Sequence, residues 1–147
     1  FWHIRDNIAP AERAEGPALQ HDISVPVSAM ASFIEKESPE IEAKFPGTHI
    51  IAFGHMGDGN IHYHVKAPKG VEPDIWYREM SGPISSDVYD RVATYGGSIS
   101  AEHGIGQAKL SELARLSDPA RLFALRAIKS AFDPKNILNP GKLIPPV

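Results

Sequence analysis

Two histidines flank a tight-turn motif in the segment Gly54-His55-Met56-Gly57-Asp58-Gly59-Asn60-Ile61-His62-Tyr63-His64. An Asp-Gly pair favours a two-residue hairpin loop, so Asp58 and Gly59 predict a reversal in which His55 pairs directly with His62. Directly opposed residues of such a pair point to the same face, with Cβ atoms about 4.5–5.5 Å apart. Two imidazoles at that spacing can bind one divalent cation through their ring nitrogens. The segment therefore predicts a metal-binding hairpin.

Strand alternation places other side chains relative to this pair. With a period of two residues, Phe53 and His64 share the face of the two histidines, whereas Met56, Ile61 and Tyr63 lie on the other face. The alternative is a polar surface hairpin whose histidines face solvent and bind nothing. The opposed register of the pair favours the metal site.

A third ligand is available in the segment Ser100-Ala101-Glu102-His103-Gly104-Ile105-Gly106. Glu102 and His103 are adjacent, so within a strand they would point in opposite directions, but a bend at Gly104 can bring both to one site. An exposed Glu-His pair before a loop is the alternative. Two histidines and one carboxylate leave coordination positions open, which is typical of a catalytic metal site. The donor set alone leaves open a zinc or manganese Lewis acid and a non-haem iron oxygenase.

Composition excludes several classes of protein. The 147 residues carry 15 Lys+Arg, 18 Asp+Glu and no Cys, for a formal net charge of −3. A chain without Cys has no disulfide framework, no Cys-based zinc site and no thiol nucleophile. Nucleic-acid binding needs a concentrated basic face, and no such cluster is present. With no long apolar run and no signal-peptide pattern, the sequence predicts a soluble, cytoplasmic chain.

Hydrophobic periodicity and turn residues predict short strands separated by helices, with a hairpin, in the α+β or α/β class. The expected strands cover residues 21–25, 49–53, 61–65 and 98–101. One helix is expected to end at Pro10. Three more are expected from Pro26 to Pro46, from Pro83 to Gly96 and near residues 107–116. The last helix is expected to begin at Asp118-Pro119 and to reach Phe132. Residues 10–20 are expected to form a loop or a short helical turn, and residues 67–73 a loop. Because the chain opens on Phe1-Trp2 without an initiator Met, we expect it to be part of a longer protein.

Three segments together resemble a known family. Residues 54–62, 97–106 and 133–142 occur in the order and at the intervals found in the C-terminal part of the FAD-linked 2-hydroxy acid dehydrogenases. This family includes D-lactate dehydrogenase, the glycolate oxidase FAD subunit and D-2-hydroxyglutarate dehydrogenase. Arg5 and the segment 21–26 fit the same family, so the resemblance covers nearly the whole chain.

The resemblance implies an α+β substrate domain, present as its ferredoxin-like second half. Residues 1–132 would form an antiparallel sheet packed by helices, and residues 133–147 a C-terminal helical tail that returns to the FAD-binding domain. That domain would lie N-terminal to this region and hold most of the FAD. The chain alone is then expected to be inactive.

The resemblance also implies a role for each site residue. A divalent metal, zinc or manganese, would be held by His55, His62 and Glu102. The remaining roles are His103 as the base that takes the hydroxyl proton, Arg5 and His64 as substrate-binding residues, and Asn139 and Lys142 as residues near the flavin. A guanidinium fork suits a substrate carboxylate.

Two positions depart from the D-2-hydroxyglutarate dehydrogenases. Gln20 stands where those enzymes have a substrate-contacting Lys, and His64 stands where they have an Asn. The loss of a cation at Gln20 argues against a second substrate carboxylate, so lactate-like acids are expected rather than 2-hydroxyglutarate.

The implied reaction is oxidation of a D-2-hydroxy acid to the 2-oxo acid, with hydride transfer to the flavin. The implied partners are the small acid, the chain's own FAD-binding domain and an electron acceptor, with a homodimer left open and no nucleic acid. One alternative is a stand-alone metal-binding or interaction domain. The other, a 2-His-1-carboxylate oxygenase, needs the many short strands of a double-sheet barrel, and only four candidate strands are present.

Overall fold

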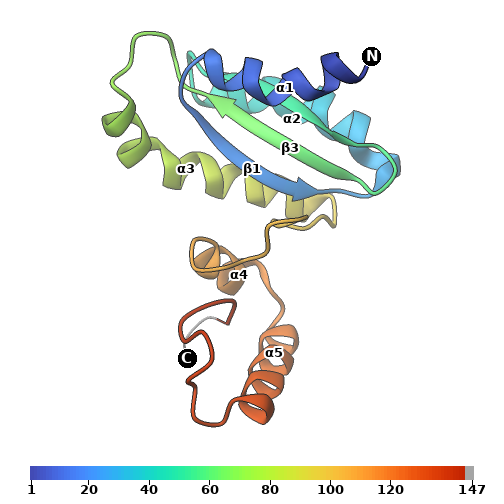
Figure 1. Cartoon of the computed structure of the whole chain (residues 1–147), viewed down its shortest axis with the longest axis vertical. Coiled ribbons are helices and arrows are strands. Elements are labelled where there is room, and N and C mark those ends of the chain that lie inside the picture. The colour runs from blue at the N-terminus through green and yellow to red at the C-terminus, as the bar shows by residue number, and fades with distance from the viewer. Residues whose placement is uncertain (145–147) are drawn as a thin grey trace. The chain divides into compact units, whose positions relative to one another are not determined.

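The computed structural model describes residues 1–144, which divide into two compact units, Phe1–Ala101 and the part that begins at Glu102 (Figure 1). The first unit holds a three-stranded sheet and three long helices, and the second holds two helices and the tail. The α+β class with an antiparallel sheet packed by helices is therefore confirmed.

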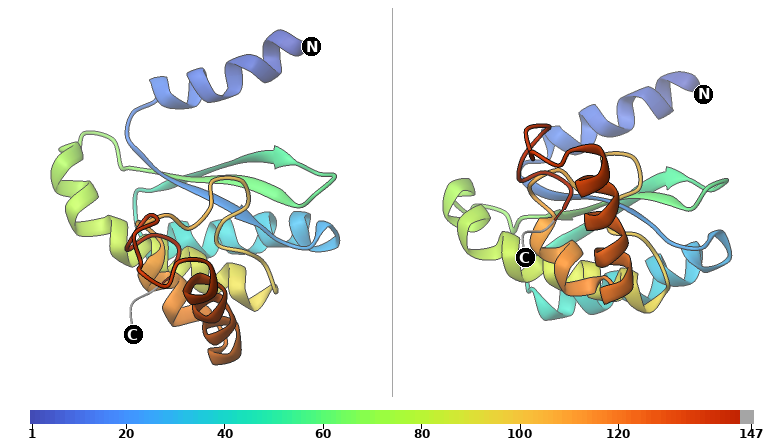
Figure 2. Two further views of the ribbon diagram at one scale, coloured as in Figure 1. Left: turned by 60° about the horizontal axis from the view of Figure 1, so that its bottom comes forward. Right: turned by 90° about the horizontal axis from the view of Figure 1, so that it is seen from below.

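The sheet has the order β1-β3-β2, and both pairings are antiparallel. Its strands are β1 (Ala18–Ser24), β2 (His49–His55) and β3 (Asn60–Lys66). The helices of this unit are α1 (Trp2–Ala14), α2 (Met30–Lys44), preceded by a short 3-10 turn (Val27–Ala29), and α3 (Pro73–Thr94). Helix α1 lies on one side of the sheet, and α2 and α3 lie on the other (Figure 2). A single three-stranded sheet is not the double-sheet barrel that the oxygenase alternative requires.

The central strand separates a hydrophobic core from a polar face. Ile61, Tyr63 and Val65 point toward α2 and α3 and are at most 1% exposed. The alternate residues His62 and His64 lie on the side of α1, as the period of two predicts. The hydrophobic core thus lies between the sheet and helices α2 and α3, while the opposite face of the sheet carries histidines that point toward α1.

The turn of the β2–β3 hairpin is longer than predicted. His55 pairs with Asn60 and Phe53 pairs with His62, so residues 56–59 form a four-residue loop. Asp58 Oδ1 accepts a hydrogen bond from the Asn60 N–H at 3.1 Å, which closes this loop. The predicted pairing of His55 with His62 is therefore wrong. Met56, predicted on the opposite face, lies in the turn and is 80% exposed.

Two helices differ from the prediction at prolines that were expected to end or begin them. Helix α1 continues past Pro10, and α3 begins at Pro73 instead of Pro83. The early start of α3 has a clear cause, because the Glu72 side chain accepts a hydrogen bond from the Ile75 N–H at 2.8 Å and caps the helix. A proline at the first helical position loses no hydrogen bond.

The fourth predicted strand is reduced to one bridge. Ser98 exchanges two backbone hydrogen bonds with Ser24, at 3.0 and 2.8 Å, which form an isolated bridge and not a strand. Residues 10–20, predicted to form a loop or a short helical turn, contribute the last residues of α1 and the start of β1.

The second unit contains α4 (Leu110–Leu116), α5 (Pro119–Phe132) and the tail. Asp118 caps α5 by accepting a hydrogen bond from the Ala120 N–H at 2.7 Å, as its sequence predicts. The division into a substrate domain 1–132 and a tail 133–147 stays a prediction, and residues 145–147 lie outside the described part. Within residues 1–144, no helix combines the length and apolar character needed to cross a membrane.

The hairpin turn predicts a position-specific loss of stability. Gly59 has φ +78°, and a Cβ atom there would lie 2.1 Å from the Val25 carbonyl oxygen. We expect Gly59→Ala to lower the free energy of unfolding by more than about 1 kcal/mol, measured by urea denaturation. Gly57→Ala in the same turn meets no atom within 4 Å and should change it by less than about 0.5 kcal/mol. Equal losses in the two variants would contradict this account of the turn.

Candidate functional site

One face of α1 and the polar face of the sheet enclose a pocket. Residues 5, 8, 9 and 12 follow the helical spacing i, i+3, i+4, i+7, so they share the face of α1 that turns toward the strands. The pocket has a volume of about 340 Å³. It is lined by Arg5, Asp6, Ile8 and Ala9 of α1 and by Phe53, Gly54, His55 and His62 of the hairpin. A cation of α1 therefore lines the same pocket as the two predicted metal ligands.

The two histidines share a face despite the changed register. A shift of two residues preserves the side to which each side chain points, so His55 and His62 are diagonal neighbours rather than direct partners. Their ring centroids lie 6.3 Å apart, with the ring planes nearly perpendicular. His55 is exposed and His62 is half-buried. Two imidazoles at this spacing on one face suit a shared cation.

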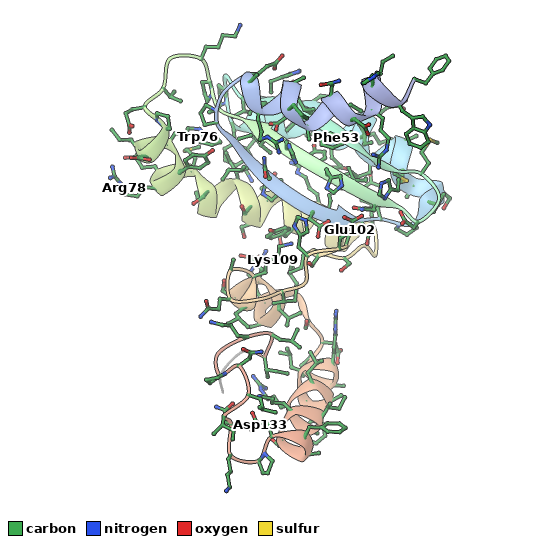
Figure 3. All side chains as sticks on the ribbon, viewed as in Figure 1. Phe53, Trp76, Arg78, Glu102, Lys109 and Asp133 are labelled. Carbon is green, nitrogen blue, oxygen red and sulfur yellow. The ribbon has the colours of Figure 1, made fainter. Side chains whose placement is uncertain are left out.

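Phe53 lies between the histidines of β3. It pairs with His62, and its ring centroid lies 5.2 Å from that of His62 and 5.2 Å from that of His64. The side chain is labelled in Figure 3 on the α1 side of the sheet. Phe53 thus forms an apolar wall beside the predicted metal ligands.

A buried ion pair fixes the other end of α1 to the sheet. The Lys66 ammonium donates to the Glu12 carboxylate at 3.0 Å, to the Glu12 carbonyl at 2.9 Å and to the Gly16 carbonyl at 2.7 Å. Lys66 is 5% exposed and Glu12 is 4% exposed. Because the two carbonyls belong to the end of α1 and the residues that follow it, one ammonium both pairs with α1 and caps it.

His64 lies beside this ion pair. It is 7% exposed, and its Nδ1 atom lies 3.4 Å from Glu12 Oε2. Burial lowers the pKa of His64, and the nearby Glu12 carboxylate opposes that effect. The structure thus places His64 beneath α1 next to Glu12, and its role in substrate binding stays a prediction.

Asp22 is a site candidate that the sequence did not reveal. It pairs with His62 in the β1–β3 register, so its carboxylate lies on the same face of the sheet as the histidines. Asp22 is 3% exposed and accepts a hydrogen bond from the Ala101 N–H at 3.1 Å. Only the strand register places Asp22 beside His62, and no local motif signals it.

Glu102 and His103 begin the second unit and are exposed. Gly104, directly after them, has φ +77°, which provides the predicted bend. The convergence of Glu102 with His55 and His62 stays a prediction.

Asn139 and Lys142 line one pocket of the second unit. This pocket measures about 350 Å³ and lies between α5 and the tail. The tail is held by Asp133, whose carboxylate accepts hydrogen bonds from the Ile137 and Leu138 N–H groups, each at 2.9 Å. The Lys129 ammonium also donates to Asp133 and is the main cause of its lowered pKa. Asn139 and Lys142, the two residues predicted to lie near the flavin, thus line the same pocket.

Comparison with known proteins identifies the family of this chain. A family model described as FAD linked oxidases, C-terminal domain, matches residues 1–143. The chain belongs to this family. The resemblance inferred from three sequence motifs is therefore confirmed.

Several curated relatives align with nearly the whole chain. It is 34% identical over 143 residues to the D-2-hydroxyglutarate dehydrogenase of Stutzerimonas stutzeri (strain A1501), covering 97% of the chain and 30% of that protein. It is 34% identical over 144 residues to the D-lactate dehydrogenase of Anaerostipes hadrus, covering 97% and 29%. The mitochondrial D-2-hydroxyglutarate dehydrogenase of Arabidopsis thaliana is 32% identical over 146 residues, covering 99% and 24%. The chain thus spans less than a third of the length of these relatives.

The buried ion pair predicts how firmly α1 is held. Lys66→Met leaves the Glu12 carboxylate buried without its ammonium, so we expect a loss of about 3–5 kcal/mol in the free energy of unfolding. Amide hydrogens of residues 2–14 should also exchange faster. The matched variant Lys44→Met removes an ion pair with Asp87 in which the lysine is 57% exposed, and should cost at most about 1 kcal/mol.

The double variant Glu12→Met with Lys66→Met tests whether the loss of stability in Lys66→Met comes from the unpaired Glu12 carboxylate. It removes both charges, so it should be more stable than Lys66→Met alone. Unchanged amide exchange of α1 in Lys66→Met would show that this ion pair does not hold the helix.

Proposed function

We propose that this chain is the substrate- and metal-binding part of an FAD-dependent dehydrogenase that oxidises a D-2-hydroxy acid to the 2-oxo acid. The observation that carries this proposal is the pocket that Arg5 lines together with His55 and His62. A 2-hydroxy acid presents a carboxylate and a hydroxyl on neighbouring carbons. In this pocket Arg5 offers a cation for the carboxylate, and His55 and His62 offer a metal-binding pair for the hydroxyl.

Arg5 is suited to bind the substrate carboxylate. Its guanidinium has five N–H donors in a planar fork, and the contact of Nη1 with Asp6 Oδ1 at 3.3 Å engages one side of that fork. The Arg5 side chain is 63% exposed, so it reaches the pocket without a large desolvation cost. Paired N–H donors fix the orientation of a carboxylate as well as binding it.

His55 and His62 would hold the divalent metal, with Glu102 as the third ligand. Two imidazoles and a carboxylate match the donor preference of zinc and suit manganese, and leave room for substrate oxygens. When bound, the metal would orient the 2-hydroxyl and make it more acidic. On this account His55 and His62 orient the hydroxyl, while Arg5 orients the rest of the acid.

His103 would take the hydroxyl proton. Imidazole accepts a proton near neutral pH, and His103 is an exposed residue directly before the Gly104 bend. The flavin, when bound, would accept the hydride from C2, and a separate electron acceptor would then reoxidise it. Asn139 and Lys142 would contact the flavin from the second unit.

The flavin-binding region is proposed to lie in the part of the relatives that the chain does not cover. The curated relatives are more than three times as long as the aligned segment. The chain alone should therefore neither hold FAD tightly nor turn over substrate.

Metal binding gives the first test of the site. In the flavoprotein that contains this chain, His55→Ala and His62→Ala should each weaken zinc or manganese binding at least about 100-fold, measured by titration calorimetry. This bound is conservative, because even residues that only support metal ligands contribute about 10–100-fold. His49→Ala is the control, since His49 is an exposed histidine of the same strand that does not line the pocket and contacts Glu42 of α2. An equal loss in His49→Ala, or a wild-type protein that binds neither metal, would contradict the site.

Substrate oxidation gives the second test. The flavoprotein should reduce its flavin with at least one acid among D-lactate, glycolate and D-2-hydroxyglutarate. A chelator should abolish this reduction, and added metal should restore it. Flavin reduction that is insensitive to the chelator would rule out the role of the metal in catalysis.

A further inference from the structure

We propose that Asp22 is a positioning residue, whose buried carboxylate fixes the ring of His62 in the tautomer that can bind a metal. The inference rests on the proposed function and adds to it a residue that the proposed reaction does not use. Asp22 itself would contact neither the substrate nor the metal, and would act through His62.

The two strands that flank His62 place chemically different side chains beside its ring. On β2 its partner is Phe53, whose ring centroid lies 5.2 Å from that of His62. On β1 its partner is Asp22. Directly opposed residues of antiparallel strands point to the same face, with Cβ atoms about 4.5–5.5 Å apart. Of these two cross-strand partners, Asp22 is the one that offers polar side-chain atoms to the imidazole.

The Asp22 carboxylate is buried and fixed in position. Asp22 is 3% exposed, and its Oδ2 atom accepts a hydrogen bond from the Ala101 N–H at 3.1 Å. Its neighbours along β1, His21 and Ile23, pair with core residues of β3 and are at most 2% exposed. Because both neighbours are locked in the core, the backbone of β1 cannot move the Asp22 side chain away from His62 without opening that core.

A metal-binding imidazole needs an acceptor for its second ring nitrogen. The metal takes the lone pair of one nitrogen, so the proton of the neutral ring must lie on the other. A carboxylate that accepts this N–H favours the metal-binding tautomer and makes the ligand nitrogen more basic. The strand register places Asp22 to supply this acceptor to His62.

A second buried carboxylate on this side of the sheet serves a different histidine. Glu12 pairs with the Lys66 ammonium at 3.0 Å, and its Oε2 atom lies 3.4 Å from His64 Nδ1. His64 is two residues beyond His62 on β3, so it shares the same face. Glu12 and Asp22 thus lie beside successive histidines of one strand, and Asp22 is the carboxylate beside His62.

Asp22→Asn tests this role because it exchanges one carboxylate oxygen for an N–H donor at nearly constant size. The Ala101 N–H needs the remaining amide oxygen as its acceptor, so we expect the new NH₂ group to face His62. That group donates to the ring nitrogen beside it, which moves the ring proton to the nitrogen that should bind the metal. In the flavoprotein that we propose contains this chain, Zn²⁺ affinity should fall about 10–100-fold, measured by titration calorimetry.

Asp87→Asn is the matched control for a loss of stability. Asp87 lies on α3, on the other side of the sheet (Figure 2), its side chain is 10% exposed, and it pairs with Lys44 and Arg91. Urea denaturation should show that both variants are less stable than the wild type, whereas Zn²⁺ affinity should be unchanged in Asp87→Asn. Equal losses of affinity in the two variants, or an unchanged affinity in Asp22→Asn, would overturn the inference.

The tautomer of His62 gives a test that needs no metal. In the metal-free flavoprotein labelled with ¹⁵N-histidine, long-range ¹H–¹⁵N spectra at about pH 8.5, above the ordinary pKa of imidazole, show which ring nitrogen carries the proton. His62→Ala assigns the signal. We expect a single tautomer in the wild type and the opposite one in Asp22→Asn. A mixture of tautomers in the wild type, or the same tautomer in both proteins, would overturn the inference.

The two measurements keep this inference distinct from the proposed function. A wild-type flavoprotein that binds no Zn²⁺ or Mn²⁺ but shows the reversal of the His62 tautomer would defeat the proposed metal site, while supporting Asp22 as the residue that positions His62. A protein that binds the metal tightly with an unchanged tautomer in Asp22→Asn would keep the metal site and overturn the role of Asp22.

Discussion

The site depends on one buried ammonium. Lys66, at the end of β3, donates to the Glu12 carboxylate and to two carbonyls where α1 ends. An amphipathic helix with a proline near its middle has little reason to be stable alone. The ammonium satisfies the carbonyls at the end of α1 and pairs with a carboxylate one turn beyond Ala9. This contact fixes the helix face that carries Arg5, Ile8 and Ala9 over the sheet.

Two kinds of packing then meet across the sheet. On one side, Ile61, Tyr63 and Val65 are sealed by α2 and α3, which makes β3 a rigid central strand. On the other side, the same strand presents His62 and His64 to α1. Because side chains alternate along β3, the strand that the hydrophobic core holds in place also carries the side chains of the polar face. The proposed metal ligands of the hairpin and the proposed substrate-binding cation of α1 thus belong to separate elements that share one sheet.

Sequence reasoning succeeded where the signal is local and periodic. The α+β class, the alternating face of His62 and His64, and the capped start of α5 all follow from neighbouring residues. It failed at the hairpin loop, because Asp58-Gly59 is compatible with both a two-residue and a four-residue turn. Sequence reasoning also ended α1 at Pro10, because the contacts that stabilise the helix beyond this residue come from Lys66, which is distant in the sequence. Asp22 was missed for the same reason, since only the register of distant strands places it beside His62.

The most direct test of this account is a crystal structure of the flavoprotein that we propose contains this chain, grown with Mn²⁺ and a 2-oxo acid product. The account predicts an anomalous scattering peak between the rings of His55 and His62, with Glu102 completing its ligands and the product carboxylate on the Arg5 guanidinium. A peak elsewhere, or a carboxylate bound away from α1, would contradict the central claim that α1 and the hairpin together form the substrate site.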